Sequence, residues 1–181
     1  MKPLGEALGF LAIVVGFILF QQNDRRKILR LKLVCDALWA THFGLLGALS
    51  GMAISMVAAL REITFSRVRK DGQKKGRLWL LLFLSINILS VVLSWNSPWS
   101  LCSLISGLLA TTAFWQSSPN RIKVLSLIVC ASQITYAIAM RSYAAGINEL
   151  ITVTSILLFF IRTANVSKNA KKKEHTTEEQ A

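Results

Sequence analysis

Long runs without charged side chains, separated by short basic segments, are the dominant pattern of this chain. No charged residue occurs from Ala37 to Leu60 or from Leu78 to Asn120. A water-soluble fold cannot cover such runs, whereas one helix across a bilayer core of ~30 Å takes ~20 apolar residues. The pattern therefore predicts an all-α polytopic membrane protein.

Glycine, proline and basic residues divide the chain into seven predicted helices. A single helix over residues 33–60 would exceed the thickness of the hydrocarbon core, so the glycine-containing stretch from Gly44 to Gly51 is predicted to interrupt it. The segment Trp95-Asn96-Ser97-Pro98-Trp99 suits a tight turn at a membrane interface. The predicted helices cover about residues 7–23, 28–48, 51–67, 78–95, 99–117, 122–140 and 146–163. The polar residues from Ser167 to Ala181 are predicted to be disordered.

Composition supports the membrane class and argues against several chemistries. The chain of 181 residues is 53% hydrophobic and 17% charged, whereas a soluble domain carries about 25% charged residues. Cys35, Cys102 and Cys130 form no paired motif and are predicted to be small buried side chains. With only two histidines, the sequence predicts no metal site and no cofactor. It also carries no nucleic-acid-binding motif and no catalytic motif, so we expect neither nucleic-acid binding nor enzymatic activity.

The distribution of positive charge predicts the orientation. Of the 21 Lys and Arg residues, all except Lys2 and Arg141 fall in segments that a seven-helix chain places on the side of its C-terminus. Because cytoplasmic loops of membrane proteins are rich in Lys and Arg, we expect the N-terminus outside and the C-terminus in the cytoplasm. A six-helix arrangement would mix the basic loops between the two sides.

An internal repeat appears when the chain is shifted by 95 residues. This shift aligns Gln21 with Gln116, Gly51 with Gly146 and Val34-Cys35 with Val129-Cys130, and it keeps the helix breaks and basic loops in register. Each copy holds three helices, an odd number, so one further helix between the copies lets both share one orientation. The predicted fold is thus two parallel three-helix repeats, related by a pseudo-two-fold axis along the membrane normal. Gene duplication without any role in transport also explains the repeat.

The predicted domain boundaries follow from this repeat. Residues 1–69 form the first three-helix repeat, 70–97 a basic loop and a linker helix, 98–164 the second repeat, and 165–181 a disordered basic and polar cytoplasmic tail.

The 3-1-3 plan, with a glutamine at the inner end of the first helix of each copy, resembles the PQ-loop/SWEET superfamily. The segments Phe20-Gln21-Gln22-Asn23-Asp24-Arg25-Arg26 and His42-Phe43-Gly44-Leu45-Leu46-Gly47 resemble more closely the bacterial inner-membrane family typified by YgjV. The likeness covers roughly residues 5–165 and implies the SWEET-like fold and the inner membrane. Phe20 and Trp115 stand where the superfamily has the proline of its PQ dipeptide.

Polar and aromatic side chains at mid-membrane depth are the candidate binding residues. In the first copy, Trp39 and His42 share an arc of the second helix, and the resemblance implies that Trp39 and Tyr136 are the aromatic pair lining a SWEET-like cavity. His42 suits solute or proton binding, or equally a hydrogen bond to a neighbouring helix. Asp36 is better explained by a surface pair with Lys32 than by a site.

The second copy adds Gln133 on the sixth helix and Asn148 on the seventh. The resemblance implies a binding asparagine on the last helix of each copy, although Ala53 stands at the matching position of the first copy. Glu149 is better explained by an interfacial ion pair with Arg141. The complete predicted substrate-binding set is Trp39, His42, Gln133, Tyr136 and Asn148.

Two functional hypotheses follow. The first is a small-solute transporter or facilitator of the inner membrane, with a site at the midplane between the repeats. The second is a non-transporting accessory or assembly protein on the same scaffold. The expected partners are the lipid bilayer and a small solute, and the sequence is compatible with oligomers.

Overall fold

The computed structural model describes residues 2–47, 49–68, 74–93, 95, 98–139, 141 and 143–179. Within these ranges the chain forms seven helices and no strand, which is the predicted number and order of helices. The helices are α1 (Lys2–Phe20), α2 (Arg25–Leu45), α3 (Leu49–Arg67), α4 (Lys74–Leu93), α5 (Ser100–Trp115), α6 (Pro119–Ala139) and α7 (Tyr143–Glu179). Parts of three predicted interruptions, at residues 48, 69–73 and 96–97, lie outside the described residues.

Local sequence signals set several helix boundaries. Asp24 has an extended backbone, and its carboxylate accepts a hydrogen bond of 2.9 Å from the backbone N–H of Arg26. This N-cap starts α2 three residues earlier than predicted. Pro119 occupies the first position of α6, where the missing N–H of proline costs nothing. After α2 the chain turns at Gly47, whose φ of 76° is a left-handed conformation that suits glycine.

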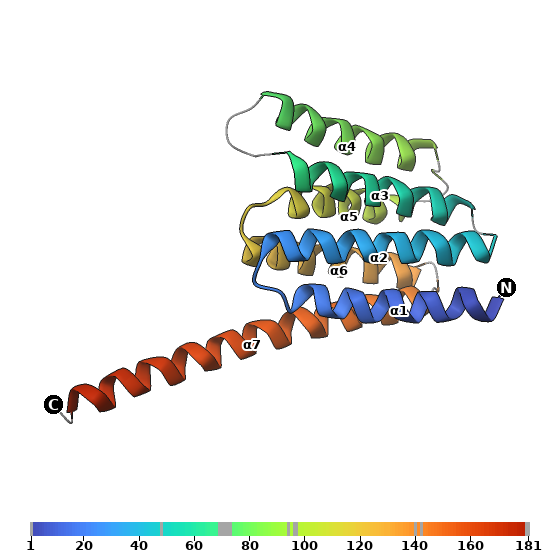
Figure 1. Cartoon of the computed structure of the whole chain (residues 1–181). Helices are drawn as coiled ribbons and strands as arrows, with labels where there is room; N and C mark the ends of the chain where they lie inside the picture. The colour runs from blue at the N-terminus through green and yellow to red at the C-terminus, as the bar shows by residue number, and fades with distance from the viewer. Residues whose placement is uncertain are drawn as a thin grey trace.

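The C-terminal segment differs from the prediction. The sequence predicts disorder from Ser167, but the structure continues α7 as one helix to Glu179. The segment contains several good helix formers, Ala, Lys and Glu, and neither Gly nor Pro follows Gly146. A polar composition therefore did not exclude a helix. In Figure 1 this half of α7, coloured red, projects away from the other helices.

The helices form two rows of three with α4 at the side. In one row α2 contacts both α1 and α3, and in the other α6 contacts both α5 and α7. The rows meet where α1 contacts α7 and where α3 contacts α5, while α4 packs against α5. Figure 1 shows the helices lying side by side and alternating in direction. We call the end where α1, α3 and α5 finish the basic end, and the opposite end, where the chain begins, the N-terminal end.

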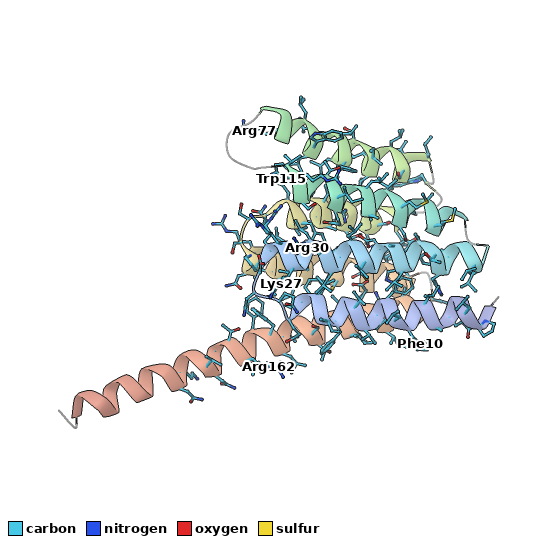
Figure 2. The ribbon with its side chains drawn as sticks, viewed as in Figure 1. Phe10, Lys27, Arg30, Arg77, Trp115 and Arg162 are labelled. Atoms are coloured by element: carbon cyan, nitrogen blue, oxygen red, sulfur yellow. The ribbon has the colours of Figure 1, made fainter. Side chains whose placement is uncertain are left out.

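Positive side chains gather at the basic end. Figure 2 shows Lys27, Arg30, Arg77 and Arg162 on that side of the molecule, whereas Phe10 is labelled about halfway along α1. These basic residues come from α2, α4 and α7, which lie far apart in the sequence. The fold thus brings the separate basic segments to one end.

The outer surface of the bundle is strongly apolar. Phe10 is 71% exposed, Leu93 78% and Ile138 73%, and large exposed apolar side chains occur along every helix. Within the described residues, four helices are long and apolar enough to cross a membrane by length and composition: Pro3–Phe20, Gly76–Leu93, Pro119–Ala139 and Ala145–Val166. The apolar helix Ser100–Trp115 is shorter, and α2 and α3 both contain charged residues within their length. This surface fits a helical membrane protein.

The buried apolar core lies towards the basic end. It consists of residues from the ends of helices that meet there, together with one residue from the middle of α4 and one from α7: Leu19, Phe20, Ile28, Leu29, Phe65, Phe83, Phe114, Ile122 and Ile156. Phe65 is completely buried, and its ring lies edge-on to Phe83 at 5.6 Å and to Trp115 at 4.9 Å between centroids. Large side chains therefore fill the interior at this end.

Candidate functional site

Two connected hollows lie between the rows of helices. The inner cavity, of about 220 Å³, is lined by residues of every helix except α4. The outer cavity, of about 860 Å³, lies towards the N-terminal end and is lined by residues of α1, α2, α3, α6 and α7. The two cavities share Ile13, Trp39, Gln133, Asn148 and Glu149.

Small residues on the inner face of α1 leave room for this space. Gly9 and Gly16 line the outer and the inner cavity respectively, and Ala12 between them is fully buried. One turn further along, Leu19 and Phe20 enter the apolar core. Because residues three and four apart share a helix face, one stripe of α1 changes from small to large towards the basic end.

The structure brings four of the five predicted binding residues to the cavities. Trp39, Gln133 and Asn148 line both, and His42 lines the outer one. Tyr136 is half-buried and is not among the described lining residues of either cavity. The repeat shift of 95 residues places Trp39 on Ile134, so Tyr136 is two residues, or about 200° of helix rotation, out of register. Under this shift Tyr136 is therefore not the residue equivalent to Trp39.

His42 is held by the neighbouring helix and still faces the outer cavity. Its Nδ1 lies 2.7 Å from the carbonyl oxygen of Gly5 on α1, so Nδ1–H donates to that oxygen. A Cβ atom at Gly9 would lie 2.9 Å from the same nitrogen, so the approach depends on glycine. The ring also lies edge-on to Trp39 at 5.2 Å and to Phe43 at 5.0 Å. Both sequence interpretations, the interhelical bond and the place on the cavity, are compatible with this geometry.

Asp36 pairs with Lys32 as predicted, but the pair is not on the surface. Asp36 is only 4% exposed, and Lys32 lines the inner cavity. The second carboxylate oxygen, Oδ2, is buried without a hydrogen-bond partner among the described residues. The wall of the cavity, rather than solvent, surrounds this ion pair.

A second ion pair, which the sequence interpretation missed, lies on α3. Arg61 donates to the Glu62 carboxylate at 3.0 Å and to Thr111 of α5 at 3.1 Å, and Glu62 is fully buried. Thr111 also accepts from Asn87 of α4 at 3.1 Å, so Asn87 joins α4 to α5. Arg61 was counted with the basic loop after the third helix, although an ionisable pair within an apolar helix is itself a signal of function.

Phe114 of α5 links the two pairs. The Lys32 ammonium lies 5.5 Å from the centre of this ring, and the Arg61 guanidinium lies 5.6 Å from it. Cations at this distance from an aromatic face are attracted by its quadrupole. Two cations and two carboxylates thus form a neutral group of charges beside the inner cavity.

Glu149 carries a carboxylate that lines both cavities. It does not pair with Arg141: the ion pairs among the described residues are Lys32–Asp36 and Arg61–Glu62. Its Oε1 instead accepts a hydrogen bond of 3.3 Å from the side chain of Asn148. The predicted interfacial ion pair is therefore wrong for the described structure.

Hydrogen bonds between the rows close the basic end. Arg25 of α2 donates to the carbonyl oxygen of Gln116 at 2.7 Å, and Lys123 of α6 donates to that of Gln22 at 2.7 Å. Gln21 donates to both the backbone oxygen and the hydroxyl of Ser155 on α7, at 2.7 and 2.9 Å. Each row thus contributes a cation that bonds the end of the first helix of the other row.

The cysteines and the acidic residues do not assemble into a metal site in the part of the chain that the structure describes. Cys35 and Cys130 are buried and Cys102 is half-buried, all as free thiols. Cys35 donates to the backbone oxygen of Ala12 at 3.4 Å. The structure therefore places two of the three cysteines where small apolar residues were predicted.

The chain has an apolar outer surface, positive side chains gathered at one end and a partly polar interior cavity. These features define it as a helical membrane protein. The family comparison then gives the particular group. Residues 3–167 match Imp-YgjV, the bacterial inner membrane protein family, and the chain belongs to this family. No curated protein and no solved structure matches the chain.

Proposed function

We propose that this protein spans the inner membrane seven times and moves a small solute through the cavity between two three-helix repeats. The observation that carries the proposal is the hollow itself, which is wide towards the N-terminal end, narrow at mid-depth and closed at the basic end. A solute-sized space lined by a few polar and aromatic residues is the usual form of a binding site. The proposal includes neither an enzymatic reaction nor nucleic-acid binding.

The helix contacts support the SWEET-like repeat. Exchanging α1, α2 and α3 with α5, α6 and α7 turns the contact between α1 and α7 into the contact between α5 and α3. The contacts of α2 with its neighbours likewise become those of α6. The hydrogen bonds of Arg25 and Lys123 follow the same exchange, because each runs from the second helix of one row to the end of the first helix of the other row. The two residues themselves are not equivalent in the repeat. This pattern is what a pseudo-two-fold axis along the bundle would produce.

The charged helices α2 and α3 are compatible with spanning. Their ion pairs lie inside the bundle, so the charges avoid lipid, and polar residues facing a cavity are tolerated at membrane depth. The basic end then faces the cytoplasm and the wide cavity faces outwards.

Accessibility from the two sides of the membrane tests the proposal. Gln133→Cys is placed in a background with Cys35, Cys102 and Cys130 changed to Ala, and a membrane-impermeant thiol reagent is added to vesicles of either orientation. A protein that alternates between states reacts from both sides, and more slowly from the basic side. Reaction from the outer side alone would leave a static cavity and favour an accessory or assembly protein.

A further inference from the structure

The charges around the cavities do not balance. Lys32 and Arg61 face the inner cavity, but each is already paired with a buried carboxylate, Asp36 or Glu62. Glu149 faces both cavities, and no Lys, Arg or His side chain lies within ion-pair distance of it among the described residues. Glu149 is therefore a carboxylate on the wall of both cavities without an ion-pair partner among the described residues.

The outer cavity adds to this negative character. Glu6 lines it near the N-terminal end, and no Lys or Arg side chain is among its described lining residues. A cleft with low-dielectric walls focuses the field of such charges and raises the local concentration of ions of opposite sign. The route from the N-terminal end to Glu149 thus favours cations.

Aromatic rings line the same cavities as the Glu149 carboxylate. Trp39 lines both cavities with Glu149, and its ring stacks with that of Phe43 at 5.6 Å. Phe10 and His42 complete the aromatic side of the outer cavity. A carboxylate beside aromatic faces is the chemistry that recognises an ammonium group, because the carboxylate supplies charge and the rings supply their negative faces.

We propose that the transported solute is a small organic cation, a compound with an ammonium group that binds between Glu149 and Trp39. This inference rests on the proposed function, since it assigns a class of solute to the same cavity. The ammonium group supplies the ion-pair partner that Glu149 lacks. Lys32 and Arg61 do not repel it strongly, because each is paired with its own carboxylate.

Charged thiol reagents measure the predicted potential directly. Gln133→Cys, in the background without native cysteines, reacts with a trimethylammonium-ethyl or a sulfonato-ethyl methanethiosulfonate of similar size. The ratio of the two rates cancels the thiolate fraction of the cysteine, which affects both reagents equally. We expect the ratio of cationic to anionic rate to exceed that of 2-mercaptoethanol in solution by about tenfold or more. Glu149→Gln should lower the ratio most of the way towards the solution value, with Glu6 left to account for the remainder.

Matched variants separate the local charge from a general effect. Glu149→Asp keeps the charge and should keep the ratio. An unchanged ratio in this variant would show that substitution at this position does not by itself disrupt the fold. Glu174→Gln removes a carboxylate from the C-terminal part of the same helix and should leave the ratio unchanged. An equal fall in Glu174→Gln would overturn the assignment to Glu149.

Protection of the same cysteine tests binding. Choline is compared with 3,3-dimethyl-1-butanol, its uncharged isostere, and an ethylammonium salt with 1-propanol, each as a competitor of an uncharged thiol reagent. We expect at least one cation to slow labelling at concentrations where its neutral partner has no effect, and Glu149→Gln to lose this protection. Equal protection within both pairs, or a faster reaction with the anionic reagent, would overturn the inference. Failure of every reagent to label Gln133→Cys would instead overturn the proposed function.

Discussion

The two ends of the bundle are built differently from the same helices. At the basic end, large apolar side chains fill the interior, and Arg25, Lys123 and Gln21 tie the rows together. Towards the N-terminal end the same rows enclose a cavity of about 860 Å³. The inner stripe of α1 changes accordingly, from Gly9 to Phe20. The difference indicates that packing closes one end, while small residues and a few polar contacts hold the other end open.

Breaking the ion pair between Arg61 and Glu62 should give the largest effect on stability. Arg61→Ala leaves the fully buried Glu62 carboxylate without its cation, and losing one partner of a buried pair costs about 3–5 kcal/mol. The thermal unfolding temperature of the purified protein in detergent should fall strongly. The double variant Arg61→Leu with Glu62→Leu should recover most of the loss, because apolar residues can replace a buried pair. A mild effect of Arg61→Ala alone would mean that the pair is hydrated.

At the closed end, Lys123→Met should weaken the junction between the rows. Lys123 is fully buried, donates to the Gln22 carbonyl and lies 2.9 Å from the centre of the Phe159 ring. Hydrogen bonds to charged groups contribute about 1.5–3 kcal/mol, and methionine fills a similar volume without a donor. Thermal unfolding and reagent access from the basic end should both report the change.

The matched control for this variant is Arg121→Met, two residues away on the exposed side of α6. It should leave both quantities unchanged. Equal effects of the two substitutions would show that net charge, and not the bridge between the rows, is responsible.

At the open end, Gly9→Ala should disturb the position of His42. The added Cβ would lie 2.9 Å from Nδ1 of His42, so the ring must move and lose its bond to Gly5. Overpacking of this kind costs about 1–3 kcal/mol. Gly16→Ala on the same helix is the control, because its Cβ meets only Cys35 Sγ at 3.8 Å. That variant should be neutral or slightly stabilising in thermal unfolding, since alanine favours helices.

The smallest effect is expected at the start of α2. Asp24→Ala removes the N-cap that accepts from the backbone N–H of Arg26, and loss of such a cap costs about 1 kcal/mol. Asp24→Asn can still cap the helix and should restore most of the stability. If Asn fails where Asp succeeds, the negative charge rather than the cap stabilises this turn.

The arrangement of helices was largely readable from the sequence. Charge-free runs, the basic loops and residues such as Pro98 and Pro119 punctuate the chain strongly, and each signal is local. The C-terminal helix was missed because polarity indicates exposure and says little about backbone conformation, and Lys171-Lys172-Lys173 suits a solvated helix as well as a coil.

The site was less predictable, because it depends on which faces of the helices meet. Trp39 and Gln133 were predicted from their depth in the membrane, which follows from their positions along the predicted helices. Tyr136 was chosen for its side-chain type and lies out of register with Trp39. The pairing of Arg61 with Glu62, and the absence of an Arg141 partner for Glu149, depend on side-chain packing that the sequence pattern does not encode.

A ladder of cysteines along one face of α6 tests the contrast between the ends most directly. Gln133 lines both cavities, Cys130 and Ser126 line the inner one, and Ile122 belongs to the packed core. Single cysteines at these four positions, each in a background without the other cysteines, are exposed to a water-soluble thiol reagent from the outer side. Ile128 and Ile138, which are exposed apolar positions of the same helix, serve as lipid-facing controls.

The structure predicts that labelling falls steadily from residue 133 through 130 and 126 and stops at 122, with both controls unlabelled. Uniform protection along the ladder would mean that the bundle is packed throughout. Labelling that is equally fast at all four positions would mean that the basic end is open, and either result would contradict a hollow closed at one end.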